Sequence, residues 1–144
     1  MALDFGCIDL PDKLNFDIDS NFSTWLNKVE GEEGLGLVIF HVNIRCIRLY
    51  WDNFLRSLSN GVDKCDVIIL SEINIPDYEC PLFCIEGFEM FSFCQKGSAK
   101  GGIMMFVKSD LAAKDVSFKM SSCESIKVRL NFSKRKLLDV IAVY

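Results

Sequence analysis

Polar side chains follow two apolar stretches of this sequence at the point where each stretch ends. The stretch LGLVIFHVNI carries His41 and Asn43 near its end, and the stretch DVIIL is followed closely by Glu72. A carboxylate at a strand end suits a hard cation such as Mg²⁺, which takes oxygen ligands and keeps several waters. The pattern leaves two interpretations open. Either Glu72 and Asn43 share a metal or phosphate site, or Glu72 points into solvent while Asn43 makes a turn.

Two strands with a helix between them would bring these side chains together. Residues 35–44 form a β-rich apolar run of the kind that is buried on both faces, and residues 66–71 form a second one. The segment between them predicts a helix that ends at Asn60-Gly61. Its apolar residues recur at helical spacing, namely Leu49, Trp51, Phe54, Leu55 and Leu58. A right-handed crossover with parallel strands is the default for such a unit. Asn43 and Glu72 should therefore emerge at the same edge of one sheet.

The rest of the chain predicts strands without helices. We expect strands over 88–94, 102–108, 125–132 and 137–144, with a turn at 133–135. Ile126, Val128 and Leu130 alternate with polar residues, so they should face a core. Together, the predicted strands and helix indicate an α+β domain over residues 37–144. Residues 1–36 are predicted to be an N-terminal extension with one short helix that carries Phe22, Trp25, Leu26 and Val29 on one face.

Composition limits the classes of function. The chain has 144 residues, 50% of them hydrophobic, and a net charge of -4, so it predicts a globular protein without the Lys/Arg excess of most nucleic-acid binders. Lys96, Lys100 and Lys108 flank a glycine-rich turn and are interpreted as a solvated loop. No leader or membrane-spanning stretch is recognisable. We expect an intracellular protein, nuclear or cytoplasmic, with no membrane partner.

The cysteines argue against a zinc site. There are seven cysteines without a CxxC pair, and there is one histidine. We expect a reduced chain in which most cysteines act as small hydrophobic residues. The spacing of Cys80 and Cys84 around Pro81 is interpreted as chance.

An ordered set of motifs carries a family resemblance. The set is HVNIR (41–45), a helix containing WDNFL (51–55), DVIILSE (66–72), KGGIMMFVK (100–108) and LLDVIAVY (137–144). In this order they resemble the endonuclease/exonuclease/phosphatase superfamily, and within it the apurinic-endonuclease-like domain of non-LTR retrotransposons. The resemblance covers roughly residues 37–144.

The resemblance implies both a fold and an activity. The fold would be a partial four-layer αββα sandwich whose C-terminal part is missing. The activity would be Mg²⁺-dependent hydrolysis of phosphodiesters, with Mn²⁺ as a substitute and DNA as a weakly bound partner. Glu72 would be the metal ligand, Asn43 would face the metal as a catalytic residue, and Tyr144 would contact the scissile phosphate. The metal would polarise the phosphate while a base activates water.

The sequence also departs from the family pattern. Ile73 stands where the family commonly has threonine, and the later Asp-x-Asn and Asp-His motifs do not occur before Tyr144. His41 shares the face of Asn43, but its apolar neighbours indicate a core or edge histidine rather than a base. We therefore expect little or no activity from the chain as it stands. Two alternatives remain: an interaction module that uses an open sheet for self-association or partner binding, and a retroelement relic.

Overall fold

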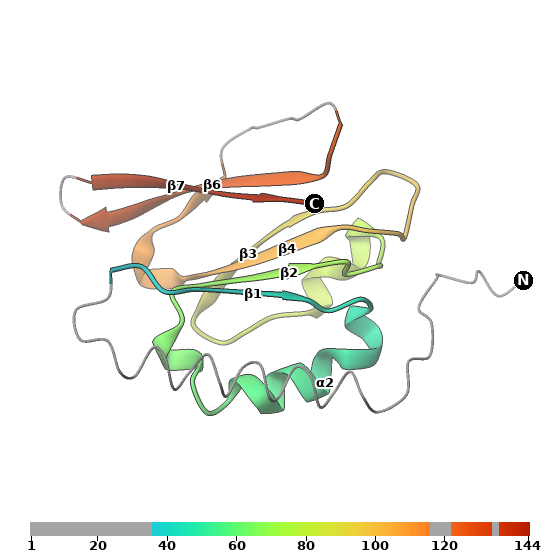
Figure 1. The fold of residues 1–144 in the computed structure, drawn as a ribbon, viewed down its shortest axis with the longest axis horizontal. Helices are drawn as coiled ribbons and strands as arrows, with labels where there is room; N and C mark the ends of the chain where they lie inside the picture. Colours follow the sequence, from blue (N-terminus) through green and yellow to red (C-terminus); the bar gives the residue numbers. More distant parts are fainter. Residues whose placement is uncertain (1–35, 116–121, 134–135) are drawn as a thin grey trace, which may run out of the picture.

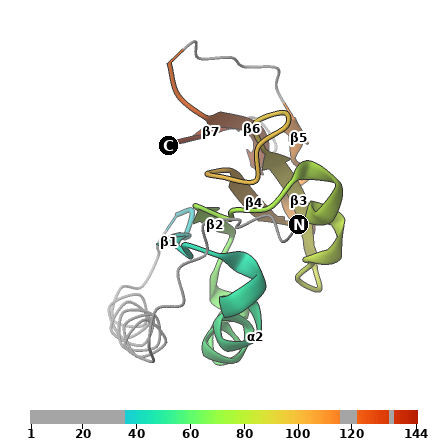
Figure 2. The same ribbon diagram turned by 90° about the vertical axis from the view of Figure 1, so that its right-hand side faces the viewer.

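Two β-sheets lie face to face, with a helix on the outer side of the larger sheet. The computed structural model describes residues 36–115, 122–133 and 136–144. Figure 2 shows three layers, in which helix α2 (Ile47–Leu58) lies below the larger sheet and the smaller sheet lies above it. The α+β class is confirmed. The fourth layer, a helix outside the smaller sheet, is not seen in the described residues, and the predicted helix before residue 36 lies outside them.

The larger sheet contains the predicted strand–helix–strand unit. Its strand order is β1-β2-β4-β3, with β1 (Ile39–Asn43), β2 (Val67–Ser71), β3 (Phe88–Phe93) and β4 (Ile103–Lys108). β1 and β2 are parallel, as predicted, and α2 crosses between them below the sheet (Figure 1). β4 runs antiparallel to both of its neighbours. Asn43 pairs with Ser71, so the ends of β1 and β2 meet at one edge.

Helix α2 covers one face of this sheet. It buries Ile47, Tyr50, Phe54 and Leu58, which recur at helical spacing. Trp51 stacks on Phe106 of β4 with ring centroids 5.9 Å apart. The helix begins two residues before Leu49, and Leu49 is 49% exposed, so its predicted place on the apolar face is wrong. Ile47 fills that place one turn before Tyr50.

The smaller sheet has the order β5-β6-β7, with β5 (Lys114–Asp115), β6 (Ser125–Ser133) and β7 (Lys136–Val143). The inward prediction for β6 is confirmed, because Ile126, Val128 and Leu130 are buried against the larger sheet. Three short 3₁₀ helices complete the described elements, at Val62–Lys64, Asp77–Leu82 and Ser109–Leu111. β5 and these turns are too short for a periodic pattern to predict.

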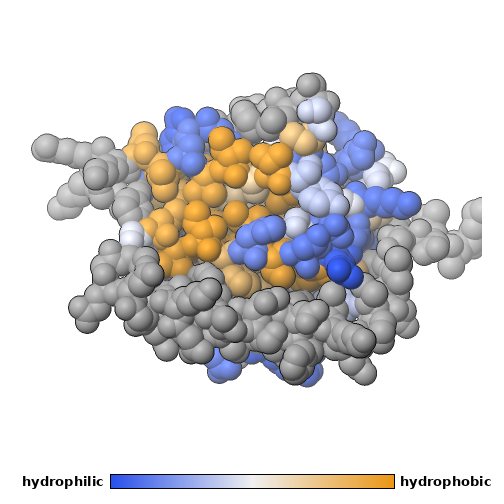
Figure 3. All heavy atoms as spheres, viewed as in Figure 1, coloured by the Kyte–Doolittle hydropathy of each residue, from blue (hydrophilic) through white to orange (hydrophobic). Residues whose placement is uncertain are grey.

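The first strand is not buried on both faces, which corrects the prediction from its apolar sequence. Phe40 is 6% exposed because it faces α2, whereas Ile39 on the opposite face is 40% exposed and His41 is also exposed. The smaller sheet packs over β2, β4 and β3, and it does not cover this face of β1. Figure 3 shows apolar atoms gathered on this side of the molecule. Across the described residues, no helix has the length and apolar character needed to span a membrane.

Candidate functional site at the strand ends

Tyr144 connects the two sheets through the predicted metal ligand. Its hydroxyl donates a hydrogen bond to Oε1 of Glu72, with 2.7 Å between the oxygens. Glu72 follows β2 in the larger sheet and Tyr144 follows β7 in the smaller one. Accepting this bond, Glu72 raises the pKa of the Tyr144 hydroxyl above its ordinary value of 10.0. Tyr144 therefore keeps its proton at neutral pH and acts there as a donor.

Asn43 stands beside this pair at the end of β1, and its side chain makes a turn. Its Oδ1 accepts a hydrogen bond of 3.0 Å from the backbone N–H of Arg45. The chain then continues along the sheet, because Ile44 donates its N–H to the carbonyl of Ser71 at 3.0 Å. The turn that the sequence offered as one alternative for Asn43 is thus present. Glu72, in contrast, holds Tyr144 and does not simply extend into solvent.

Left-handed backbone conformations concentrate at this edge. Arg45, Glu72 and Asn74 have φ values of 58°, 54° and 53°, and they are three of the four non-glycine residues with positive φ in the described part of the chain. Side chains in this region cost about 1–3 kcal/mol unless the surroundings enforce the conformation. Strained residues of this kind are frequent at binding and catalytic sites. The three positive φ values make this edge of the sheet a candidate functional site.

Asn74 holds the two strand ends and the next loop together. Its side-chain amide donates to the carbonyl of Arg45 and accepts the N–H of Gly101 at 2.7 Å. Its backbone N–H also donates to the carbonyl of Gly101 at 2.8 Å. Asn74 was visible in the sequence only as one more polar residue near a strand end. We call Asn43, Glu72, Asn74 and Tyr144 the strand-end cluster.

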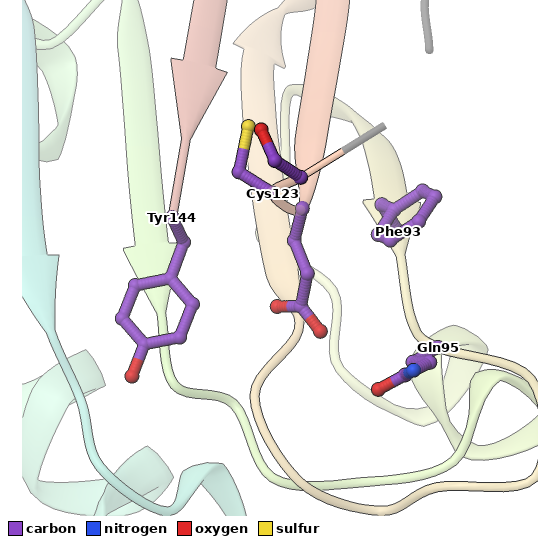
Figure 4. Close-up of a pocket in the computed structure, with 6 residues that line it drawn as sticks. Phe93, Gln95, Cys123 and Tyr144 are labelled. Carbon is purple, nitrogen blue, oxygen red and sulfur yellow. The ribbon is translucent and has the colours of Figure 1, made fainter. Parts of the chain in front are cut away.

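Glu124 adds a second carboxylate near Tyr144. The two residues exchange backbone hydrogen bonds of 3.0 and 2.9 Å, and Oε2 of Glu124 accepts the N–H of Gly102 at 2.6 Å. A cavity of about 390 Å³ opens here and is lined by Phe93, Gln95, Ser122, Cys123, Glu124 and Tyr144. Figure 4 shows Tyr144 on one side of it and Phe93 and Gln95 on the other. Sequence reasoning missed Glu124, although its place directly before a strand was a signal of the same kind as that of Glu72.

Comparison with known proteins identifies the fold. The chain matches no family model and no curated protein. Among solved structures it is similar to the AP endonuclease LMAP from Leishmania major, with a TM-score of 0.56 and 16% sequence identity. The chain shares its fold with an AP endonuclease. The alignment covers 74% of this chain and 39% of that one, so the chain spans less than half the length of the enzyme it resembles.

The similarity to an AP endonuclease supports the predicted type of fold. Identity this low shows the fold alone. The finer assignment to the retrotransposon type, and the roles of Asn43, Glu72 and Tyr144, stay predictions.

His41 lies apart from the strand-end cluster in its hydrogen bonding. Its Nε2 is 3.1 Å from the hydroxyl of Ser71. Both residues line a cavity of about 210 Å³ between the larger sheet and residues 141–143 of β7. Of the two expected environments, core and edge, the structure gives His41 the edge, because β1 is the outermost strand and the residue is exposed.

Of the three lysines predicted to lie in a solvated loop, two lie in one. Lys96 and Lys100 are exposed between β3 and β4, as interpreted, but Lys108 is the last residue of β4. Its Nζ donates to the carbonyl of Asp63 at 2.7 Å and lies 3.9 Å from Oδ1 of Asp66. The prediction of a solvated loop is wrong for Lys108, because these acceptors hold it on the side of the α2–β2 connection.

The donor atoms of the strand-end cluster fit one kind of metal site. Glu72 and Asn43 offer carboxylate and amide oxygens, which are hard ligands suited to Mg²⁺ or Mn²⁺. The residues that the structure describes contain no group of three or more His, Cys, Asp or Glu side chains that could hold an ion. Glu72 and Asn43 therefore supply two oxygen donors of the type that Mg²⁺ takes, and binding of the ion stays a prediction.

Proposed function

We propose that the strand-end cluster is the first half of a Mg²⁺-dependent phosphodiesterase site, within the N-terminal part of a retroelement-type DNA endonuclease. The observation that carries this proposal is the hydrogen bond of 2.7 Å between Tyr144 and Glu72. It joins residues far apart in the sequence at one edge of an AP-endonuclease-like fold. A protein that needed only a stable sandwich would gain little from an exposed carboxylate held by an exposed phenol across two sheets.

Each residue has a distinct task in this proposal. Glu72 binds the cation through its carboxylate, and Asn43 orients a ligand water or a phosphate oxygen. A bound Mg²⁺ supplies Lewis-acid polarisation of the phosphate. Tyr144 has one hydroxyl proton, which Glu72 accepts in this structure, so the hydroxyl would have to turn from Glu72 to donate to a phosphate oxygen.

The same geometry argues that this chain alone is a poor catalyst. Phosphodiester hydrolysis by water needs a group that accepts a proton from the nucleophile. The neutral Tyr144 hydroxyl is a poor proton acceptor, and His41 bonds Ser71 rather than a member of the strand-end cluster, so we assign the role of base to neither residue. We expect little or no nicking of supercoiled DNA by the chain in Mg²⁺.

Calorimetric titration with Mn²⁺ and Mg²⁺ tests the site independently of catalysis. We expect weak binding by the unmodified chain and at least a tenfold loss in Glu72→Gln, because the only charged ligand is removed. Glu89→Gln is the matched control, since Glu89 is an exposed carboxylate on β3. Circular dichroism must first show that both variants are folded. Equal metal affinity in Glu72→Gln and Glu89→Gln would then refute the metal assignment.

A specific observation favours a second candidate function, which is association through the smaller sheet. β7 exposes three apolar side chains, Leu137 at 65%, Ile141 at 47% and Val143 at 55%, and between the first two Asp139 pairs with Lys127 and Arg129. In the described part of the chain, β7 pairs only with β6 and therefore leaves one edge of backbone donors and acceptors open. Such edges and patches pair with other chains.

Sedimentation velocity distinguishes this second candidate from a monomeric scaffold. If β7 mediates self-association, Ile141→Lys combined with Val143→Lys should return the protein to a monomer. Leu82→Lys is the control, because Leu82 is 73% exposed on a 3₁₀ helix away from β7. A wild-type chain that stays monomeric at high concentration contradicts the candidate.

A further inference from the structure

Two free thiols face each other in the core between the larger sheet and helix α2. Sγ of Cys80 lies 3.5 Å from Sγ of Cys94. Cys80 is buried in the 3₁₀ helix Asp77–Leu82, and Cys94 is half-buried directly after β3. The sequence did not indicate this pair, because Cys84 lies closer to Cys80 along the chain than Cys94 does. Sulfur atoms at this separation need only a small shift to reach bonding distance.

The two thiols lie within hydrogen-bond distance of each other, and their pKa values shift in opposite directions. The hydrogen bond from Cys94 lowers the pKa of Cys80 to about 7, and a second bond from Ser92 acts in the same direction. The same bond to Cys80, together with burial, raises the pKa of Cys94. The pKa of Cys80 is therefore the lower of the two, which makes Cys80 the readier nucleophile. This is the arrangement of an attacking and a resolving cysteine.

We propose that Cys80 and Cys94 are a redox modification site that forms a reversible intramolecular disulfide when the protein meets a small hydroperoxide. The thiolate of Cys80 attacks one peroxide oxygen, the O–O bond breaks, and hydroxide leaves as Cys80 becomes a sulfenic acid. The sulfur of Cys94 then attacks the sulfur of Cys80. The sulfenic hydroxyl leaves with the proton of Cys94 as water, so two thiols and one hydrogen peroxide give one disulfide and two waters.

Cys65 and Cys84 serve as internal comparisons within the described residues. Burial raises the pKa of Cys65 to about 12, and its thiol bonds the carbonyl of Gly61. Cys84 is exposed but has no thiol partner among the contacts of the described residues. Cys46 is disulfide-bonded, which is an exception to the expectation of a reduced chain. Among the thiol contacts given by the part of the chain that the structure describes, Cys80 and Cys94 combine an activated thiol with a neighbour that can trap its oxidised form.

The disulfide would act on the cavity beside the strand-end cluster. Cys94 lies between Phe93 and Gln95, which both line that cavity. Cys80 belongs to the segment that follows the Glu72–Asn74 turn. A covalent link between them closes the loop 80–94 and fixes the end of β3 against the 3₁₀ helix. Oxidation should therefore hold Phe93 and Gln95 in place.

Peptide mass spectrometry on the full chain tests the proposal. A Cys84→Ser background is needed because Cys80 and Cys84 share a peptide. Cleavage after Glu86 or Glu89 separates Cys80 from Cys94. One equivalent of hydrogen peroxide, followed by alkylation, should yield linked peptides with a mass decrease of about 2 Da for the lost hydrogens. Dithiothreitol should reverse the link, and oxidation should raise Tm by roughly 5–10 °C.

Two results would overturn the proposal. The first is alkylation or overoxidation of Cys80 and Cys94 on separate peptides with no link between them. The second is a link that forms no faster than random cross-links of the same chain in urea, where the thiols are not held together. Because the measurement uses a chain with only an exposed cysteine replaced, it does not depend on the folding of a core variant. Cys94→Ser should abolish the link and leave a sulfenic acid on Cys80.

Discussion

Asn74 should be the residue on which the geometry of the strand-end cluster depends most. Its side chain bonds the Arg45 carbonyl and the Gly101 N–H, and its backbone has a φ of 53°. Three substitutions separate these contributions. Asn74→Asp keeps the acceptor for Gly101 and loses the donor to Arg45. Asn74→Gly loses both side-chain bonds but accepts the left-handed backbone, and Asn74→Ala loses both bonds and adds backbone strain.

The expected magnitudes follow from these differences. A net hydrogen bond contributes about 1 kcal/mol, and a left-handed alanine costs roughly 1 kcal/mol more than asparagine or glycine. The free energy of unfolding should therefore fall by about 1 kcal/mol for Asp, 2 kcal/mol for Gly and 3 kcal/mol for Ala. For a chain of this size the alanine variant should lose roughly 6–12 °C in Tm.

Urea unfolding followed by far-UV circular dichroism measures all three variants against the unmodified chain. The order of the three losses is the decisive result, because errors in absolute stability cancel. Equal losses for Gly and Ala would show that the backbone strain is absorbed elsewhere. A loss below about 0.5 kcal/mol for Ala would refute the view that Asn74 holds the strand ends, since surface substitutions without a structural role fall in that range.

Two further predictions concern the same region. Gly102→Ala should destabilise the fold by about 2 kcal/mol more than Gly97→Ala in urea unfolding. Both glycines have positive φ, but a Cβ at Gly102 would lie 2.8 Å from Cγ1 of Ile73, whereas a Cβ at Gly97 would meet nothing within 4 Å. Equal losses of stability would mean that Ile73 moves aside. The Tyr144 hydroxyl should titrate above its ordinary value of 10.0 and return toward it in Glu72→Gln, as followed by NMR of ring-labelled tyrosine. Because this pKa is raised in the folded state, the stability from the bond is fully present below pH 10 and is lost as pH rises through the raised pKa. A Tyr144 pKa that stays the same in Glu72→Gln would contradict the hydrogen bond between the two residues.

Local sequence patterns predicted the elements well where packing followed periodicity. The parallel unit of β1, α2 and β2 and the inward face of β6 came from apolar spacing, because burial on one face repeats with the period of the element. The same reasoning failed for β1, whose apolar run suggested two buried faces although Ile39 is 40% exposed. Whether a second sheet covers a strand depends on the placement of distant residues, which the strand's own sequence does not encode.

The candidate site divides in the same way. The sequence by itself determined which residue types stand at the strand ends, and thus that Asn43 and Glu72 would meet at one edge of a parallel pair. Only the tertiary structure decided that Tyr144 reaches Glu72 across the sheets, that Asn74 holds Gly101, and that Cys80 faces Cys94. These contacts join separate segments, and their geometry is set by how the sheets pack and by the left-handed turns at their edge. Residue spacing along the chain carries no information about such distances, because packing and not sequence separation fixes them.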